Sequence, residues 1–195
     1  MGGPPLNCDD GNCCTVDSCA PATGCMHAPY AVPPTIVAQP SLDGGGGSCP
    51  SLWPPSHGYV DFTVADTGIQ AQAVCGGLTY RFASCASSQP EDQAGGGDGQ
   101  TLRDCVYEPA ALHLRAERDA TCSPNGRTYA MTMIVTDACG NSTISRPFTV
   151  CVWQDKEHGP DPSLGRIYSA VPGANQNDTR QGTNGTYGTT CATGR

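Results

Sequence analysis

The residues of this chain that are best able to do chemistry are its cysteines. Thirteen cysteines are spread along 195 residues. Thiols in such numbers either form disulfides in an oxidising compartment or hold zinc. Zinc sites use close Cys pairs followed by further Cys or His at finger spacing, and the sequence contains no C-x2-C pair. Disulfides are therefore predicted, and the odd number leaves at least one thiol that is free or bonded to another chain.

The spacing of the cysteines does not determine how they pair. Cys191 stands alone in a polar C-terminal segment, where it either tethers that segment to the rest of the chain or is the leftover thiol. Eleven others are predicted to form disulfides, with their pairing left open: Cys8, Cys14, Cys19, Cys25, Cys49, Cys75, Cys85, Cys105, Cys122, Cys139 and Cys151.

Carboxylates form the second chemical set, and calcium is the ligand that suits them. Hard cations take several oxygen ligands, and acids beside Gly and Asn turns can supply these oxygens. The acids predicted at strand ends or turns are Glu91, Asp98, Glu117, Asp137 and Asp155. The alternative is a set of solvated acids, with Glu117 forming exposed ion pairs worth about 0–1 kcal/mol.

A second candidate calcium turn lies near the N-terminus, at Asp9-Asp10-Gly11-Asn12. It lacks the spaced acids and the terminal Glu of an EF-hand loop. The competing interpretation is that these residues form turns, which Asp and Asn do readily beside Gly.

Signatures of an enzyme are absent from the sequence. There is no G-x-S-x-G, H-E-x-x-H, phosphate-binding loop or dinucleotide fingerprint. The four histidines are scattered through different segments. Trp53 is a candidate contact for a polysaccharide, because aromatic faces stack on sugar rings, although packing beside Pro54-Pro55 explains it equally well.

Charge and hydropathy restrict the partners and the location. The formal net charge of −8 disfavours nucleic acid and anionic membranes. No apolar run approaches the roughly 20 residues of a membrane-spanning helix, so membrane insertion is not expected. No signal peptide is recognisable at the start of the chain. We expect a secreted or cell-surface protein, either a fragment of a longer chain or one whose leader has been removed.

Alternation of apolar and polar residues indicates strands in the central part of the chain. The alternation occurs over residues 59–64, 78–83, 112–115, 129–136 and 148–152. Side chains on a strand point to opposite faces in turn, so each stretch offers one apolar face to a shared core. No helical periodicity is convincing. The predicted fold class is all-β, with a β-sandwich, a small disulfide-stapled N-terminal module and a polar C-terminal tail.

Composition divides the chain into four segments. Gly and Pro together account for 42 residues (25 + 17) and mark the joints between the segments. The segments are 1–30, a cysteine-rich repeat module; 31–47, a Pro/Gly linker; 48–158, the sandwich; and 159–195, a polar Gly/Thr-rich tail.

The first segment carries a motif of known type. Its residues run Cys8-Asp9-Asp10-Gly11-Asn12-Cys13-Cys14-Thr15-Val16-Asp17-Ser18-Cys19, followed by Gly24-Cys25. This resembles the short cysteine repeat of slime-mould extracellular-matrix proteins, which also occurs in large secreted bacterial proteins. The family pattern C-DDGN-x-C-T-x-D-x-C with a later G-C matches four of the five cysteines. Because the x position is usually not cysteine, the resemblance makes Cys13 the first candidate for the odd or inter-chain thiol.

The central segment also resembles a known module. Its characteristic stretches are Leu52-Trp53-Pro54-Pro55, Gly97-Asp98-Gly99, Asn125-Gly126-Arg127 and Val135-Thr136-Asp137-Ala138-Cys139-Gly140-Asn141. They are similar to immunoglobulin-like modules of large bacterial surface proteins, related in style to hyalin-repeat and cadherin-like domains. By analogy with cadherin-like domains, the resemblance implies that Glu117 and Asp137 bind calcium at a junction between modules. It implies no catalytic residues.

The expected function is that of an extracellular structural or adhesive module, such as a spacer, a surface repeat or a filament subunit stiffened by calcium. The expected partners are other extracellular proteins, copies of the same chain, or polysaccharide. Two alternatives stay open: a glycan- or protein-binding module, and a non-catalytic segment of a secreted hydrolase.

Overall fold

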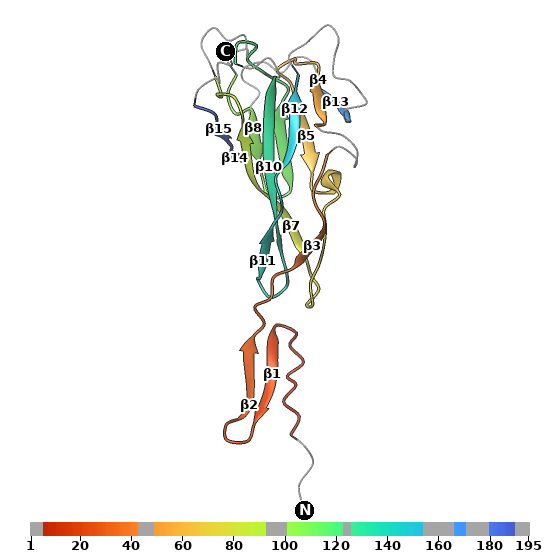
Figure 1. The fold of residues 1–195 in the computed structure, drawn as a ribbon, viewed down its shortest axis with the longest axis vertical. Helices are drawn as coiled ribbons and strands as arrows, with labels where there is room; N and C mark the ends of the chain where they lie inside the picture. Colours follow the sequence, from red (N-terminus) through yellow and green to blue (C-terminus); the bar gives the residue numbers. More distant parts are fainter. Residues whose placement is uncertain are drawn as a thin grey trace, which may run out of the picture.

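A two-stranded hairpin and a larger two-sheet body stand end to end and give the chain an elongated shape (Figure 1). Apart from the single 3-10 turn η1 (Ala65–Thr67), every regular element of the described residues is a strand, which confirms the predicted all-β class. No helix in this part of the chain is long and apolar enough to cross a membrane. The computed structural model describes residues 6–42, 49–92, 101–122, 126–153, 166–170 and 180–189.

The hairpin consists of β1 (Thr15–Ala20) and β2 (Gly24–Pro29). The strands are antiparallel, from Thr15 opposite Pro29 to Ala20 opposite Gly24. No residue of either strand is buried. A segment that buries so little apolar surface cannot be stabilised by a core and depends on cross-links.

Two large sheets form most of the larger body. The first has the strand order β13-β4-β12-β10-β7-β15, with β11 attached to β10, and the second has the order β14-β8-β9-β5. The strands of the first sheet are β4 (Ser51–Trp53), β7 (Thr79–Ser87), β10 (Arg127–Thr136), β11 (Ser142–Ile144), β12 (Phe148–Val152), β13 (Ile167–Ser169) and β15 (Thr186–Tyr187). Those of the second are β5 (Tyr59–Thr63), β8 (Cys105–Tyr107), β9 (Ala111–Arg115) and β14 (Thr183–Asn184).

The core lies between these sheets. β10 alternates strictly between buried and half-buried residues, as the sequence pattern predicts. Its inner residues pack in one cluster with Leu112 and Leu114 of β9 and with Phe62 of β5. The Cys85–Cys105 disulfide joins β7 of one sheet to β8 of the other. Cys49–Cys151 ties the start of β4 to its parallel neighbour β12.

The segment predicted as a linker differs from expectation, because much of it belongs to the body. β3 (Thr35–Ala38) pairs with β6 (Gln70–Gln72), and Leu42 is buried in the core. A four-residue strand on an edge shows too few alternations to stand out from a Pro-rich background. Residues 44–47, the glycine run, lie outside the described residues.

The segment predicted as a polar tail is likewise built into the body where the structure describes it. β13 adds to β4 in parallel register, with Ile167 opposite Ser51. β14 pairs with β8 and β15 pairs with β7, so the short stretch 183–187 touches one edge of each sheet. These strands have two or three residues each and are held by backbone hydrogen bonds, which leave no hydrophobic periodicity in the sequence.

Gly185 allows this stretch to approach the sheets so closely. Its N–H donates to the carbonyl of Cys105 at 2.7 Å. A Cβ at this position would lie 2.7 Å from the carbonyl oxygen of Cys85 and 3.0 Å from that of Cys105. The space is closed by backbone atoms, which cannot move aside as a flexible side chain would.

We therefore expect Gly185→Ala to lower the free energy of unfolding by about 1–3 kcal/mol, the usual range for inserting a group into a packed site. Gly76→Ala is the matched control, because a Cβ there meets nothing within 4 Å. Denaturant titration of both variants measures the difference. Equal stability of the two variants would show that residues 183–187 do not pack on the sheets as described.

Candidate functional site

Two disulfides attach the hairpin to the body at a place that we call the junction: Cys13–Cys75 and Cys14–Cys139. Neighbouring cysteines thus bind two different loops, since Cys75 follows β6 and Cys139 lies in the turn between β10 and β11. The Cα–Cα distances are 5.5 Å and 5.3 Å. The expectation that Cys13 is the odd thiol is therefore wrong, because its sulfur already has a partner within the chain.

The four junction sulfurs lie within 4.8 Å of one another. Four thiolates at such spacing are also the donor set of a tetrahedral zinc site. In the structure they are oxidised to two disulfides, and a disulfide sulfur is not the thiolate that zinc requires. The arrangement therefore acts as a covalent clamp.

Consecutive turns in residues 9–14 present the two adjacent cysteines to the body. The side chains of Asp9, Asp10 and Asn12 each accept a hydrogen bond from the backbone N–H two residues further on, at 2.8, 2.8 and 3.0 Å. Gly11 takes a positive φ of 71° between them. Asp and Asn form such turns readily. Asp9 and Asp10, predicted as tentative calcium ligands, thus make the turns of the competing interpretation.

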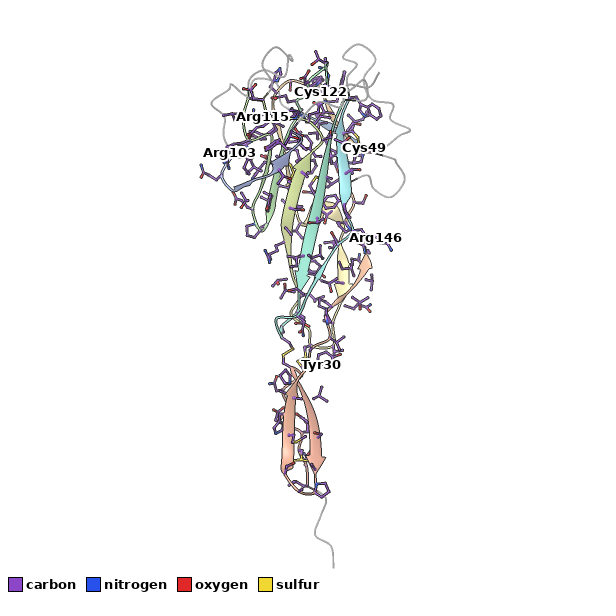
Figure 2. All side chains as sticks on the ribbon, turned by 60° about the vertical axis from the view of Figure 1, so that its left-hand side comes forward. Tyr30, Cys49, Arg103, Arg115, Cys122 and Arg146 are labelled. Atoms are coloured by element: carbon purple, nitrogen blue, oxygen red, sulfur yellow. A yellow bond between two sulfur atoms is a disulfide. The ribbon has the colours of Figure 1, made fainter. Side chains whose placement is uncertain are left out.

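Asp137 organises the other side of the junction. Its Oδ1 accepts hydrogen bonds from the backbone N–H groups of Cys139 and Asn141, both at 2.9 Å, and its Oδ2 accepts one from Asn141 Nδ2 at 3.2 Å. The same amide donates to the carbonyl of Tyr30 at 3.0 Å, which ties the turn to the end of the hairpin. In Figure 2, Tyr30 lies at the narrow connection between the two parts. The carboxylate of Asp137 thus holds the loop that receives Cys14.

The hairpin carries one polar cluster that the sequence pattern does not reveal. His27 Nδ1 lies 2.7 Å from Asp17 Oδ1 and 3.4 Å from Asp10 Oδ2. Asp17 and His27 face each other in the strand register. The hydrogen bond to Asp17 raises the pKa of His27, and the same bond lowers the pKa of Asp17. Asp17 and His27 can be recognised as neighbours only when the register of the hairpin is known, and the register depends on where the turn lies.

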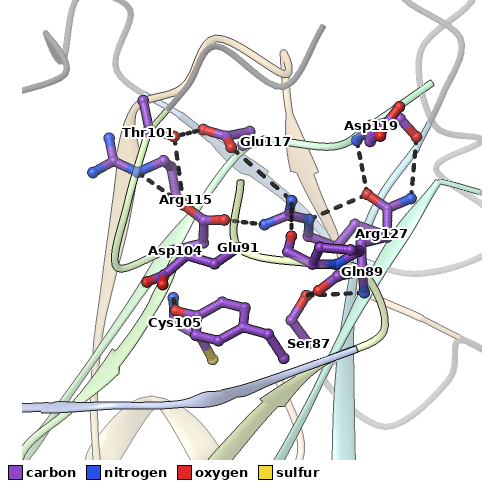
Figure 3. Close-up of polar contacts among 12 residues, drawn as sticks. Ser87, Gln89, Glu91, Thr101, Asp104, Cys105, Arg115, Glu117, Asp119 and Arg127 are labelled. Atoms are coloured by element: carbon purple, nitrogen blue, oxygen red, sulfur yellow. Dashed lines mark hydrogen bonds and ion pairs between the residues drawn. The ribbon is translucent and has the colours of Figure 1, made fainter. Parts of the chain in front are cut away.

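A network of charged residues is buried at the end of the body away from the junction, where Arg115 is labelled in Figure 2, and Figure 3 shows its contacts. Arg115, Arg127, Asp104 and Glu117 all have fully buried side chains. We call these four residues the ion network. Asp104 pairs with Nη1 of Arg127 and lies 3.4 Å from Nε of Arg115. Two positive and two negative groups balance, which burial of charge requires.

Neutral groups complete the ion network. Arg115 donates to the carbonyl of His57 at 2.8 Å and to the hydroxyl of Tyr59 at 2.9 Å. Arg127 donates to Gln89 Oε1 at 3.3 Å. Burial raises the pKa of Asp104 to about 6, against the lowering effect of the two arginines. Near pH 7.5, above this pKa, the carboxylate is charged.

Glu117, the other main calcium candidate, belongs to this ion network. Its Oε2 accepts a hydrogen bond from Thr101 and lies 3.3 Å from His57 Nδ1, and its Oε1 lies 4.0 Å from Arg127 Nη2. Arg127 begins β10, whereas Asp137 directly follows its end. Ten residues at about 3.3 Å each place Asp137 roughly 30 Å along the strand from Arg127, the residue beside which Glu117 lies. The structure therefore does not bring Glu117 and Asp137 together in one site.

Glu91, another predicted calcium ligand, is hydrogen-bonded within the body. Glu91 Oε1 accepts hydrogen bonds from the N–H of Arg103 at 2.6 Å and from Asn184 Nδ2 at 2.8 Å. Asp98, Asp155 and Cys191 lie outside the described residues. Calcium binding by the chain stays a prediction.

Trp53, the candidate sugar contact, is half-buried in β4. Its carbonyl accepts a hydrogen bond from the N–H of Ala170 at 2.9 Å. Every exposed large hydrophobic side chain among the described residues is aliphatic or methionine. An exposed aromatic platform around Trp53, which would favour a glycan-binding module, is therefore not found in this part of the chain.

Comparison with known proteins identifies the hairpin segment alone. Residues 7–29 match the family model described as the Dictyostelium (slime mold) repeat, in agreement with the resemblance read from the sequence. No curated protein and no solved structure matches the chain. The resemblance of residues 48–158 to bacterial immunoglobulin-like modules has no support from these comparisons and stays a prediction.

We expect Asp104→Asn to destabilise the protein by about 3 kcal/mol at pH 7.5, the lower end of the cost of leaving a buried charge without its partner. Asp61→Asn is the control, because Asp61 forms an exposed pair with Arg180 at 3.1 Å. Such a pair is worth about 0–1 kcal/mol. Chemical denaturation of both variants measures the contrast, and an equal loss in the two would contradict a buried ion network.

The Asp17–His27 contact predicts a pKa for His27 above the ordinary value of 6.5. The raised pKa means that the contribution of this pair to stability is complete below 6.5 and is lost as the pH rises through the folded-state pKa. Titration of the imidazole by NMR, in the folded protein and in the unfolded chain, measures the shift. Asp17→Asn should remove most of it, and a folded-state value equal to the unfolded one would refute the contact.

Proposed function

We propose that this chain is a rigid structural module of an extracellular assembly, in which the cysteine repeat and the two-sheet body form a single rod. The observation that carries the proposal is the junction, where two adjacent cysteines of the repeat bond to two separate loops of the body. A single disulfide leaves torsional freedom around its bonds. Two attachments to different loops remove most of that freedom.

Hydrogen bonds reinforce the same geometry. Asn141 binds the carbonyl of Tyr30, and Thr143 Oγ1 donates to the carbonyl of Pro34 at 2.6 Å. Both acceptors lie in the short connection between hairpin and body. The connection is therefore fixed along its length as well as at the cysteines.

The energetics favour a permanent link. The two disulfides join residues that are 62 and 125 positions apart. In the chain-entropy model, closing loops of this size stabilises the folded state by about 4–5 kcal/mol for each bond considered alone. Such bonds persist in an oxidising compartment, which agrees with a secreted or cell-surface location for a chain carrying an extracellular-type repeat.

The placement of the charged groups among the described residues supports a structural role more than a catalytic one. The four charged side chains of the ion network are fully buried and pair with one another. The acids at the junction are engaged in turns. These groups hold the fold in place, and none of them is presented to a small-molecule substrate in a described cleft.

Nitrogen-15 NMR relaxation of the hairpin residues tests the proposal. We expect the hairpin and body of the native protein to tumble with one correlation time. The quadruple variant Cys13→Ser, Cys14→Ser, Cys75→Ser and Cys139→Ser should let the hairpin move independently on the nanosecond timescale.

The double variant Cys49→Ser, Cys151→Ser is the control for this experiment. It removes a disulfide that lies within the body and away from the junction, so the hairpin should stay coupled. Independent tumbling of the hairpin in the native protein would overturn the proposed rod.

A further inference from the structure

Three cysteines gather in the hairpin away from the junction, and we call them the tip cysteines: Cys8, Cys19 and Cys25. Their sulfur atoms lie within 4.8 Å of one another. Cys8 stands in disulfide position to Cys19 and also to Cys25, with Cα–Cα distances of 6.1 and 5.1 Å. Both distances fall within the span of about 4.4–6.8 Å that disulfides adopt. Because one sulfur forms one disulfide, these are alternative pairings.

The tip holds an odd number of cysteines because the junction disulfides use the other two cysteines of the repeat. Cys14 belongs to the same repeat, but its sulfur is bonded to Cys139 of the body. Cys13, the additional cysteine of this repeat, is bonded to Cys75. Three thiols therefore remain in the hairpin, and any pairing of two of them leaves the third reduced.

The spare thiol is exposed under either pairing with Cys8. Cys8 is buried, with 6% of its surface accessible, whereas Cys19 and Cys25 are both exposed. Cys19 faces Cys25 across the hairpin, one position before the last pair, Ala20 and Gly24. The turn beyond that pair forms the end of the hairpin that points away from the body (Figure 1).

The neighbourhood of the spare thiol suits exchange. Whichever of Cys19 and Cys25 is reduced lies beside the disulfide formed by Cys8 and the other one. A thiolate next to a disulfide can attack it, so the reduced position can pass between Cys19 and Cys25 without an external oxidant. The exposed thiol is thereby kept available on the outer surface of the tip.

We propose that the tip cysteines are a thiol–disulfide exchange site through which two copies of this chain join tip to tip. This inference rests on the proposed structural function and specifies the partner of the rod at one of its ends. A low-molecular-weight disulfide, such as glutathione disulfide, is the oxidant. The tip thiolate attacks it, forms a mixed disulfide and releases one glutathione thiolate.

The second step closes the link between chains. The tip thiolate of another copy attacks the protein sulfur of the mixed disulfide, forms the inter-chain bond and releases the second glutathione thiolate. Two protein thiols are thus oxidised and one glutathione disulfide is reduced to two thiols. One spare thiol per tip permits one such bond, so assembly through this site stops at a symmetric pair.

Thiol counting on protein purified without reductant tests the site. The protein is denatured in N-ethylmaleimide at mildly acidic pH, so that exchange is quenched while thiols are labelled. We expect one label per chain among the tip cysteines, divided between Cys19 and Cys25 when fragment masses locate it. A fully oxidised tip, or a label confined to cysteines elsewhere, would overturn the proposal.

Incubation with glutathione disulfide tests the pairing. Non-reducing electrophoresis should show a species of twice the 20.1 kDa chain mass that disappears on reduction. Cys19→Ser and Cys25→Ser each leave Cys8 with one partner, so both variants should lose the label and the dimer while remaining folded. Ser18→Ala, the matched control on the same strand, keeps all three thiols and should still dimerise.

Two outcomes would contradict the exchange site. A labelled tip that forms no dimer, or a dimer that persists in both serine variants, would overturn it. The relaxation measurement on the Cys19→Ser monomer is independent of dimer formation. A native protein that forms no tip-linked dimer, together with a Cys19→Ser monomer that tumbles as one body, would therefore refute this inference and leave the proposed rod intact.

Discussion

The pair of disulfides at the junction is the constraint on which the shape of this molecule depends. The hairpin buries no residue of its two strands and has no core to fix its position. Adjacent cysteines that bond to two loops of the body hold it against the end of the sheets. A run of Asp and Asn turns on one side and the turn around Asp137 on the other bring the sulfurs to bonding distance. The Asp, Asn and Cys residues within 9–14 and 137–141 therefore contribute mainly to this one attachment.

At the end of the body away from the junction, ion pairs, rather than disulfides as at the junction, hold separate segments together. Arg115 ends a strand of the second sheet and Arg127 begins a strand of the first, and Asp104 lies against both. The ion network therefore connects the two sheets where the core between them ends. Buried ion pairs of this kind add little net stability, but each member becomes indispensable once its partner is buried. The Cys85–Cys105 disulfide adds a covalent connection between the same two sheets.

The sequence predicted the fold class and the long strands because alternation over five or more residues is a strong signal. β10 shows this most clearly, since Tyr129, Met131, Met133 and Val135 are all fully buried. The short strands β13, β14 and β15 escaped prediction because two or three residues held by backbone hydrogen bonds produce no pattern. The extra cysteine at position 13 is bonded to Cys75 and is not the odd thiol that the repeat pattern predicts. Its partner could not be inferred, because a sequence separation of 62 residues carries no information about proximity.

The acidic residues illustrate a second limit of reasoning from sequence. Glu117 and Asp137 are both predicted at strand ends, and the structure places Glu117 two residues after β9 and Asp137 directly after β10. A place at a strand end does not say which end of the sandwich a residue occupies. Whether a carboxylate is solvated, paired with a buried arginine or engaged in a turn depends on contacts from distant segments. For Glu117 those contacts come from residues 57, 101 and 127.

Mapping the disulfides of the native protein tests the central claim, the double attachment at the junction. Cleavage before Asp9, Asp10 and Asp17 separates Cys8, the Cys13–Cys14 pair, and Cys19 with Cys25 into different peptides. Trypsin at Arg81 and Arg146 then separates Cys75 from Cys85 and Cys139 from Cys151. Without reduction, the peptide holding Cys13 and Cys14 should be recovered bonded to the peptides of Cys75 and Cys139. Recovery of Cys14 bonded to Cys19 or Cys25 would mean that the repeat closes on itself, and it would contradict the account of a rod clamped at its junction.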